Sequence, residues 1–158
     1  MPTVTILIGL PGSGKSEYLK SAHQRGEPTF DDFHANAIEN SHAFENSRQR
    51  DPLKAALAAG KDCRVSDIAF CNAAHLRSVI AGIIALGCEL GTPVTVELLY
   101  FANDPLACKD NVQRRNRDSL PKELAMIEAL TTLYVIPPGA RTLPVWTPTE
   151  RQSPRTGG

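Results

Sequence analysis

The octapeptide Gly9-Leu-Pro-Gly-Ser-Gly-Lys-Ser16 matches the pattern G-x-x-x-x-G-K-[ST]. In this pattern the glycine-rich backbone turns consecutive N–H groups toward phosphate oxygens, and the lysine and serine side chains complete the site. Gly12 is an additional position without a side chain, so the backbone is free to wrap closely around a ligand. The octapeptide therefore predicts a P-loop that binds the phosphates of a nucleoside triphosphate.

The residues on both sides of the octapeptide support this prediction. Val4 to Ile8 is an apolar, β-branched run that predicts a strand buried on both faces. Residues 14–24 are compatible with a helix, and Gly26 follows as a plausible C-terminal cap. Strand, glycine loop and helix come in the order that the motif requires, and the positive end of the helix dipole adds to the attraction for phosphate.

Composition and charge narrow the class of protein. The chain has 158 residues, 42% of them hydrophobic, which is enough for one domain with a substantial core. Lysine plus arginine and aspartate plus glutamate both number 17, so no overall field attracts nucleic acid or anionic lipid. No apolar run approaches the roughly 20 residues of a membrane helix, and we expect a cytoplasmic protein with no membrane partner. The four cysteines are dispersed, which indicates reduced packing residues.

Strand and helix patterns alternate along the rest of the chain. Strands are predicted at about 28–32, 64–70, 94–101 and 143–146, and helices at about 34–50, 51–59, 73–90, 105–117 and 121–134. This alternation predicts an α/β protein with a three-layer P-loop NTPase fold, in which helices flank a parallel β-sheet. Residues 1–147 are expected to form the P-loop domain, with a lid at about 105–118, and residues 148–158 a disordered tail.

The P-loop chemistry calls for a nucleotide, a metal ion and a carboxylate. Lys15 is expected to reach the β- and γ-phosphates of ATP, and the Ser16 hydroxyl to ligate Mg²⁺. Asp67 closes the predicted strand at 64–68, where a parallel sheet presents residues to a ligand, so it is a candidate for the metal. The alternative for Asp67 is an ordinary capping aspartate at a strand end. The residues expected to contact the nucleotide are Gly9, Leu10, Pro11, Gly12, Ser13, Gly14, Lys15, Ser16, Arg114 and Arg115.

Two adjacent carboxylates end the predicted strand at 28–32. Either Asp31 or Asp32 has the chemistry to accept a proton from an attacking hydroxyl group. Because adjacent residues of a strand point in opposite directions, only one is expected to face the site. We choose Asp31, and expect Asp32 to cap the helix that follows.

A basic segment lies late in the chain. It holds Lys109, Arg114, Arg115 and Arg117. Guanidinium groups grip two phosphate oxygens at once, which suits a lid that closes over a triphosphate. The alternative is a solvated helix in which Asp110 and Arg114 pair four residues apart.

From Thr3 to Tyr134 the chain resembles the P-loop kinases grouped around the 5′-kinase domain of polynucleotide kinase. Besides the P-loop, Phe30-Asp-Asp-Phe33 is similar to the family's Asp-Asp-aromatic segment, which implies that Asp31 is the base for the acceptor. Val65-Ser-Asp67 resembles the strand whose aspartate faces the acceptor. Asn111-Val-Gln-Arg-Arg-Asn116 resembles the lid, which places the phosphate-gripping arginine at Arg114, or at Arg115 if the register differs by one.

The sequence departs from this family on the acceptor side. Ile68 and Ala69 follow the strand aspartate where the family usually has threonine and asparagine, and His34 replaces an arginine that aids substrate binding. Two functions are therefore open: an ATP-dependent phosphotransferase in which Lys15, Asp31 and Arg114 are catalytic, or an ATP-binding interaction module with little or no transfer. For a kinase, the acceptor is the 5′ end of a nucleic acid, a nucleoside or another small hydroxyl compound.

Overall fold

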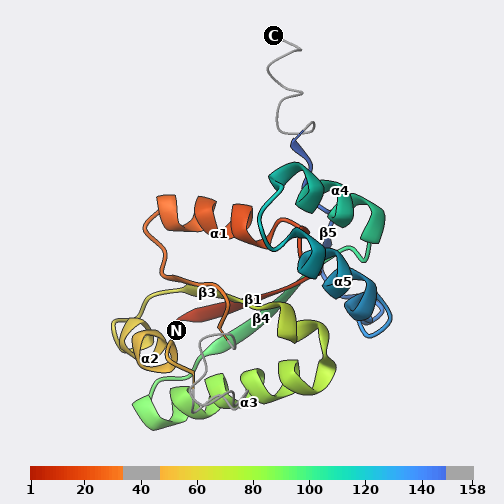
Figure 1. Ribbon diagram of the computed structural model, residues 1–158. Helices are drawn as coiled ribbons and strands as arrows, with labels where there is room; N and C mark the ends of the chain where they lie inside the picture. Colours follow the sequence, from red (N-terminus) through yellow and green to blue (C-terminus); the bar gives the residue numbers. More distant parts are fainter. Residues whose placement is uncertain (34–46, 149–158) are drawn as a thin grey trace.

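A five-stranded, entirely parallel sheet forms the centre of the molecule (Figure 1). The computed structural model describes residues 1–33 and 47–148. The strand order is β2-β3-β1-β4-β5, so β1 lies in the middle and the loop that follows it leaves the centre of the sheet edge. The strands are β1 (Thr3–Ile8), β2 (Thr29–Phe30), β3 (Cys63–Ser66), β4 (Thr95–Phe101) and β5 (Thr142–Leu143).

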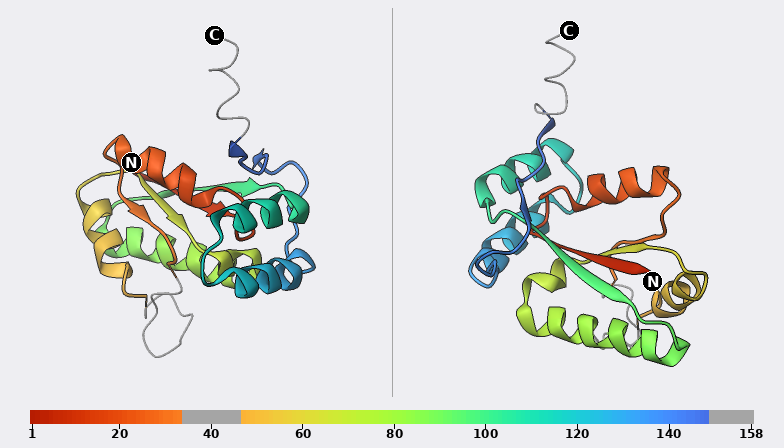
Figure 2. Two further views of the ribbon diagram at one scale, coloured as in Figure 1. Left: turned by 45° about the horizontal axis from the view of Figure 1, so that its top comes forward. Right: turned by 180° about the vertical axis from the view of Figure 1, so that it is seen from behind.

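Helices cover both faces of the sheet and one of its ends (Figures 1 and 2). The helix α1 lies on one face, α2 and α3 lie on the other, and α4 and α5 pack together beyond the carboxyl ends of the strands. The helices are α1 (Lys15–Gln24), α2 (Arg50–Ala58), α3 (Ala73–Leu90), α4 (Pro105–Arg115) and α5 (Leu120–Thr131), with a short 3-10 helix η3 (Ile68–Cys71). The predicted α/β fold class, a parallel sheet between helical layers, is confirmed.

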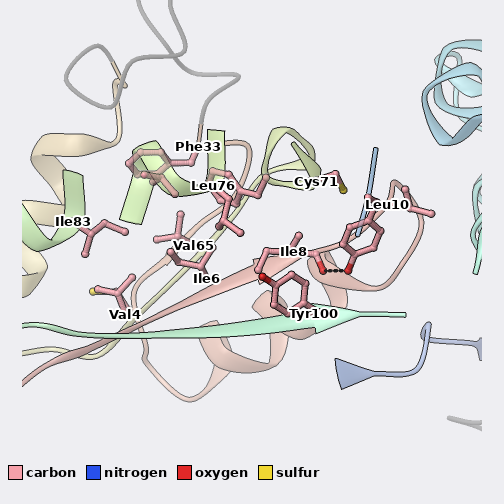
Figure 3. Packing of buried hydrophobic residues seen from close by; sticks show 14 of the residues in the cluster. Val4, Ile6, Ile8, Leu10, Phe33, Val65, Cys71, Leu76, Ile83 and Tyr100 are labelled. Atoms are coloured by element: carbon pink, nitrogen blue, oxygen red, sulfur yellow. Dashed lines mark hydrogen bonds between the residues drawn. The ribbon is translucent and has the colours of Figure 1, made fainter. Parts of the chain in front are cut away.

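Alternation along β1 explains why both faces of the sheet are covered. Val4, Ile6 and Ile8 point into the core between the sheet and the layer of α2 and α3 (Figure 3). Leu7 points to the opposite face, where it packs with Leu19 of α1 in a second cluster. A strand that is apolar on both faces must be buried on both, so the run identified in the sequence occupies the middle of the sheet.

Several predicted elements differ from the observed ones in extent. The strand predicted at 64–70 ends at Ser66, because Asp67 turns the chain into η3 by accepting a hydrogen bond from the Ala69 N–H at 2.7 Å. The strand predicted at 28–32 is reduced to two residues, and the one predicted at 143–146 is replaced by β5 at Thr142–Leu143. Of the helix predicted at 34–50, residues 34–46 lie outside the described part, and 47–49 form a bridge and turn before α2.

The helix α3 follows its predicted bounds, and its ends show why. The Asn72 side chain accepts a hydrogen bond from the Ala74 N–H at 2.9 Å, and Gly91 ends the helix with a φ of 68°. By length and composition, α3 is the one helix in the described residues that passes a test for a membrane span. Leu76, Val79 and Ile83 are buried against the sheet, as expected of the core helix of a folded domain.

Candidate functional site

The P-loop connects the carboxyl end of β1 with the first turn of α1. Gly12 and Gly14 have φ angles of 81° and 112°, which side-chain-bearing residues rarely adopt. The Ser13 N–H donates to the Leu10 carbonyl at 3.1 Å, so the loop folds back on itself before Lys15 begins the helix. The N-terminus of a ten-residue helix is therefore aimed at the space above the loop, as phosphate binding requires.

Lys15 is buried against the inner side of the P-loop. Its ammonium group donates to the carbonyl oxygens of Gly9 at 2.7 Å and Leu10 at 2.9 Å. Burial lowers the pKa of Lys15, and the neighbouring Cys71 and Asp31 act in the opposite direction. The lysine also lines the cavity described below, so the same group that organises the loop is accessible to a ligand phosphate.

The glycines of the loop allow other elements to approach the loop backbone. A Cβ atom on Gly12 would lie 2.6 Å from the Cys108 carbonyl oxygen of α4. A Cβ atom on Gly14 would lie 2.5 Å from the Cβ of Trp146. Both distances are far shorter than normal contacts, so glycine is required here by packing as well as by backbone conformation. The lid helix and the C-terminal segment thus rest directly on the P-loop.

Asn111 joins these three elements by hydrogen bonds. Its side-chain amide donates one N–H to the Gly12 carbonyl at 2.9 Å and the other to the Trp146 carbonyl at 2.6 Å. The Trp146 N–H in turn donates to the Ser13 carbonyl at 3.0 Å. Asn111 is only 7% exposed, so these bonds are shielded from water. We call this arrangement of Asn111, Trp146 and the P-loop the loop clamp.

A cavity of about 590 Å³ opens over the P-loop. This volume falls in the range of small-molecule and cofactor sites. The cavity is bounded by the P-loop, by the two carboxylates that follow β2, by η3, by the helices α4 and α5 with the link between them, and by the segment after β5. Its lining residues include Gly12, Lys15, Ser16, Asp31, Asp32, Ile68, Asn111, Arg114, Arg115, Arg117, Glu123, Met126 and Trp146.

Asp31 lies beside the serine of the P-loop. The Ser16 hydroxyl donates to Asp31 Oδ2 at 3.2 Å, and the Ser66 hydroxyl donates to Asp31 Oδ1 at 2.7 Å. The backbone is held in place by Gln49, whose side-chain amide donates to the Asp31 carbonyl at 2.8 Å. A hydroxyl and a carboxylate oxygen are thereby brought together at the start of α1, which is a donor set suited to Mg²⁺.

Asp32 does not point away from the site, contrary to the expectation from strand alternation. The strand β2 ends at Phe30, and Asp32 has a φ of 51°, so the alternation of a strand does not extend to these residues. Asp31 and Asp32 line the same cavity. Partial burial and the charges of Asp31 and Asp67 raise the pKa of Asp32, and Lys15 and Arg117 oppose this shift. Residues that Asp32 was expected to cap lie outside the described part.

Asp67 has a different environment from that of the other two carboxylates. It is 2% exposed, its Oδ1 caps η3, and it is not among the residues that line the cavity. The capping role that the sequence left as an alternative is thus present in the structure. Ile68, the next residue, lines the cavity in its place and gives that wall an apolar character.

Two lid arginines form ion pairs within the lid region. Arg114 donates to Asp110 at 2.9 Å, which is the pairing four residues apart that the sequence offered as an alternative. Arg115 donates to Glu123 of α5 at 3.1 Å. Both side chains still line the cavity. The Arg114 pair is exposed and therefore weak enough to be exchanged for a ligand phosphate, whereas the Arg115 pair is more buried.

Buried cysteines lie close to the site without the properties of nucleophiles. Burial raises the pKa of the Cys71 thiol to about 11 and that of Cys108 to about 12. In residues 1–33 and 47–148, histidine, cysteine and carboxylate side chains form no cluster of three or more suited to a metal ion.

Trp146, Asn111, Glu123 and Met126 belong to the site but had no assigned role from the sequence. They follow no phosphate-binding pattern and come from segments more than 90 residues after the P-loop. A helix-compatible pattern identified α4 and α5, but only the folded chain shows that these helices turn toward the carboxyl ends of the strands.

Comparisons with known proteins find likeness in structure and not in sequence. No family model matches the chain, and no curated protein matches it. Among solved structures, a gluconokinase from Sinorhizobium meliloti has a TM-score of 0.56 at 15% identity, covering 95% of this chain and 86% of that one. A sugar kinase from Janibacter has a TM-score of 0.58 at 17% identity, with coverages of 99% and 92%.

An uncharacterised protein from Eubacterium ventriosum also matches, with a TM-score of 0.50 at 9% identity, covering 99% of this chain and 97% of that one. At such low identities these likenesses show the fold, which is the three-layer P-loop fold that the sequence predicts. They do not single out the polynucleotide 5′-kinase group.

Proposed function

We propose that this protein is a P-loop kinase that transfers the γ-phosphoryl group of ATP to a hydroxyl group of a small molecule. The observation that carries the proposal is the contact between Ser16 of the P-loop and Asp31 within one cavity. This contact joins a phosphate-binding loop, which serves the donor, to a carboxylate with the chemistry to serve the acceptor.

Asp31 is the proposed base. In the transfer, the acceptor oxygen forms a bond to the γ-phosphorus while the bond from that phosphorus to the β–γ bridging oxygen breaks, and ADP leaves. Asp31 Oδ2 accepts the proton of the attacking hydroxyl. Its other oxygen is fixed by Ser66, so the carboxylate has one defined orientation.

Lys15 and the lid arginines are the proposed cations for the transferred charge. Lys15 exchanges its bonds to loop carbonyls for phosphate oxygens, and Arg114 or Arg115 leaves its ion pair to grip the γ-phosphate. Ser16, with Asp67 acting through a water molecule, would hold Mg²⁺, which neutralises negative charge on the phosphates. Because Asn111 of the loop clamp bonds to the Gly12 carbonyl, a movement of α4 would also shift the backbone of the P-loop.

A small acceptor is favoured over a polynucleotide. The net charge of zero offers no general attraction for a long polyanion, which gains most of its binding strength from phosphate neutralisation. The similar structures include a gluconokinase and a sugar kinase, which lends support to a small polyhydroxylated compound.

The alternative is an ATP-binding interaction module with little or no transfer. The observation in its favour is Ile68, which brings an apolar side chain into the acceptor wall where a polar residue would help to bind a hydroxyl compound. A module would still bind ATP through the P-loop, so only transfer separates the two functions.

The experiment is a transfer assay with γ-labelled ATP, Mg²⁺ and a panel of sugars, sugar acids, nucleosides and 5′-hydroxyl oligonucleotides. We expect label in one class of small acceptor. Lys15→Met should lower ATP affinity by about 10- to 100-fold, because charge-assisted bonds to phosphate are lost, whereas Lys20→Met on the exposed side of α1 should not. ATP binding without transfer to any member of the panel would favour the module.

A further inference from the structure

Arg117 differs from the other arginines of the lid region in its surroundings. Arg114 and Arg115 are held in ion pairs with Asp110 and Glu123. Among residues 1–33 and 47–148, no carboxylate lies within 4 Å of the Arg117 guanidinium. Its side chain nevertheless lines the cavity over the P-loop. A guanidinium group that faces a ligand cavity and forms no ion pair with a neighbouring carboxylate is suited to bind an anion.

Arg117 lines the same cavity as Asp31 and Asp32, the candidate groups for the acceptor. It lies in the link between α4 and α5, two residues beyond the end of α4. Its charge opposes the rise in the pKa of Asp32, which lines the same cavity. Ile68 and Met126 add apolar side chains to the same lining. The lining thus combines carboxylates, a guanidinium group and apolar surface.

The donor phosphates already have other partners. The P-loop amides, Lys15 and the start of α1 serve them, together with Arg114 and Arg115 at the lid. A ligand in this cavity would meet the carboxylates of Asp31 and Asp32 and the positive charge of Arg117. A neutral sugar or nucleoside would leave Arg117 without an anionic partner.

We propose that Arg117 binds an anionic group on the acceptor, so that the substrate class is a small hydroxyl compound carrying a carboxylate or a phosphate. This inference rests on the proposed kinase function. Asp32 binds the hydroxyl-bearing end, and Arg117 fixes the other end with a bidentate contact that only an anion accepts. Arg117 is accordingly a residue that determines specificity.

The test compares two matched pairs of probes, D-gluconate with D-glucitol and adenosine 3′-monophosphate with adenosine. The first pair isolates a carboxylate and the second a phosphate. Binding is measured by calorimetry with the protein saturated with Mg²⁺ and a non-hydrolysable ATP analogue, and transfer is measured with ATP. The variants are Arg117→Gln, Arg117→Lys and, as a matched control, Arg77→Gln on the exposed side of α3.

We expect the anionic member of at least one pair to be preferred by the wild-type protein. The preference should fall about tenfold or more in Arg117→Gln, partly return in Arg117→Lys and be unchanged in Arg77→Gln. Equal binding of both members in both pairs would overturn the inference. A loss in Arg117→Gln that is the same for charged and neutral probes would also overturn it, and would reassign Arg117 to the ATP phosphates.

Failure of the proposed function gives a different result. If no probe accepts phosphate but the anionic probe is still bound selectively through Arg117, the kinase proposal is contradicted and the anion site stands.

Discussion

Asp31 and Asp32 show how two adjacent residues of the same type acquire different properties. Asp31 accepts hydrogen bonds from Ser16, Ser66 and the Asp32 N–H, which fix the position of its carboxylate. Asp32 is partly desolvated and faces the charge of Asp31, so its pKa is raised. The difference arises from the turn at Asp32, which puts both side chains over one cavity.

The raised pKa of Asp32 predicts a pH-dependent cost to stability. As the pH rises above 3.8, Asp32 loses its proton in the unfolded chain before it does so in the folded protein. The free energy of unfolding therefore falls with rising pH until the pH passes the raised pKa of the folded protein. Asp32→Asn removes this ionisation. Its melting temperature should exceed that of the wild type at pH 7, and the gain should shrink as the pH approaches 3.8.

The control for this measurement is Asp51→Asn, at a side chain that is 89% exposed. It should give the same melting temperature as the wild type across the pH range. A gain for Asp32→Asn that does not change with pH would show that the gain does not come from the ionisation of Asp32.

At the level of elements, the P-loop is shaped by contacts that come from α4 and from the segment after β5. Gly12 and Gly60 provide a comparison, because their φ angles are 81° and 76°. A Cβ atom on Gly12 meets the Cys108 carbonyl at 2.6 Å, whereas one on Gly60 meets nothing within 4 Å. The two glycines share the conformational requirement and differ only in packing.

Gly12→Ala should therefore lower ATP affinity and stability much more than Gly60→Ala. Both variants incur the strain of a positive φ, about 1 kcal/mol, but only Gly12→Ala must also separate the loop from α4. Chemical denaturation and nucleotide titration measure both effects. Equal losses of stability for the two variants would contradict the packing of α4 on the loop.

Asn111→Leu tests the loop clamp directly. Replacing the amide leaves the carbonyl groups of Gly12 and Trp146 buried without their donor, at a cost of about 1–3 kcal/mol. The fluorescence of Trp146, the only tryptophan in the chain, should report the change in its surroundings. Gln113→Leu, at an exposed position of the same helix, is the matched control and should leave both stability and fluorescence unaltered.

The sequence predicts elements better where local patterns determine them. The strand at Val4 to Ile8 and the helix at residues 73–90 are confirmed because apolar periodicity and caps are local signals. The strand expected at 64–70 is wrong beyond Ser66, because the side chain of Asp67 bonds to the backbone ahead of it. The roles of Asn111 and Trp146 could not be predicted, since their partners lie far away in the sequence and carry no matching pattern.

For the whole molecule, the central feature is that one end of the sheet gathers the P-loop, the paired carboxylates and the lid helices (Figure 2). Because the strands β1, β3 and β4 are parallel, their carboxyl ends all lie at this end of the sheet. Cavities at such positions are the usual ligand sites of open α/β sheets, and this one brings the P-loop together with two carboxylates and three arginines. The fold is shown by the structure, and the transfer of phosphate is the claim that needs a measurement.

That measurement is single-turnover transfer from γ-labelled ATP to the best acceptor of the panel, in the wild type, Asp31→Asn and the exposed control Asp51→Asn. We predict that the wild type and the control transfer phosphate, and that the rate in Asp31→Asn is lower by about 100-fold or more. All three proteins should still bind ATP. Equal rates in the wild type and Asp31→Asn, or bound ATP with no transfer by the wild type, would contradict a kinase in which Asp31 is the base.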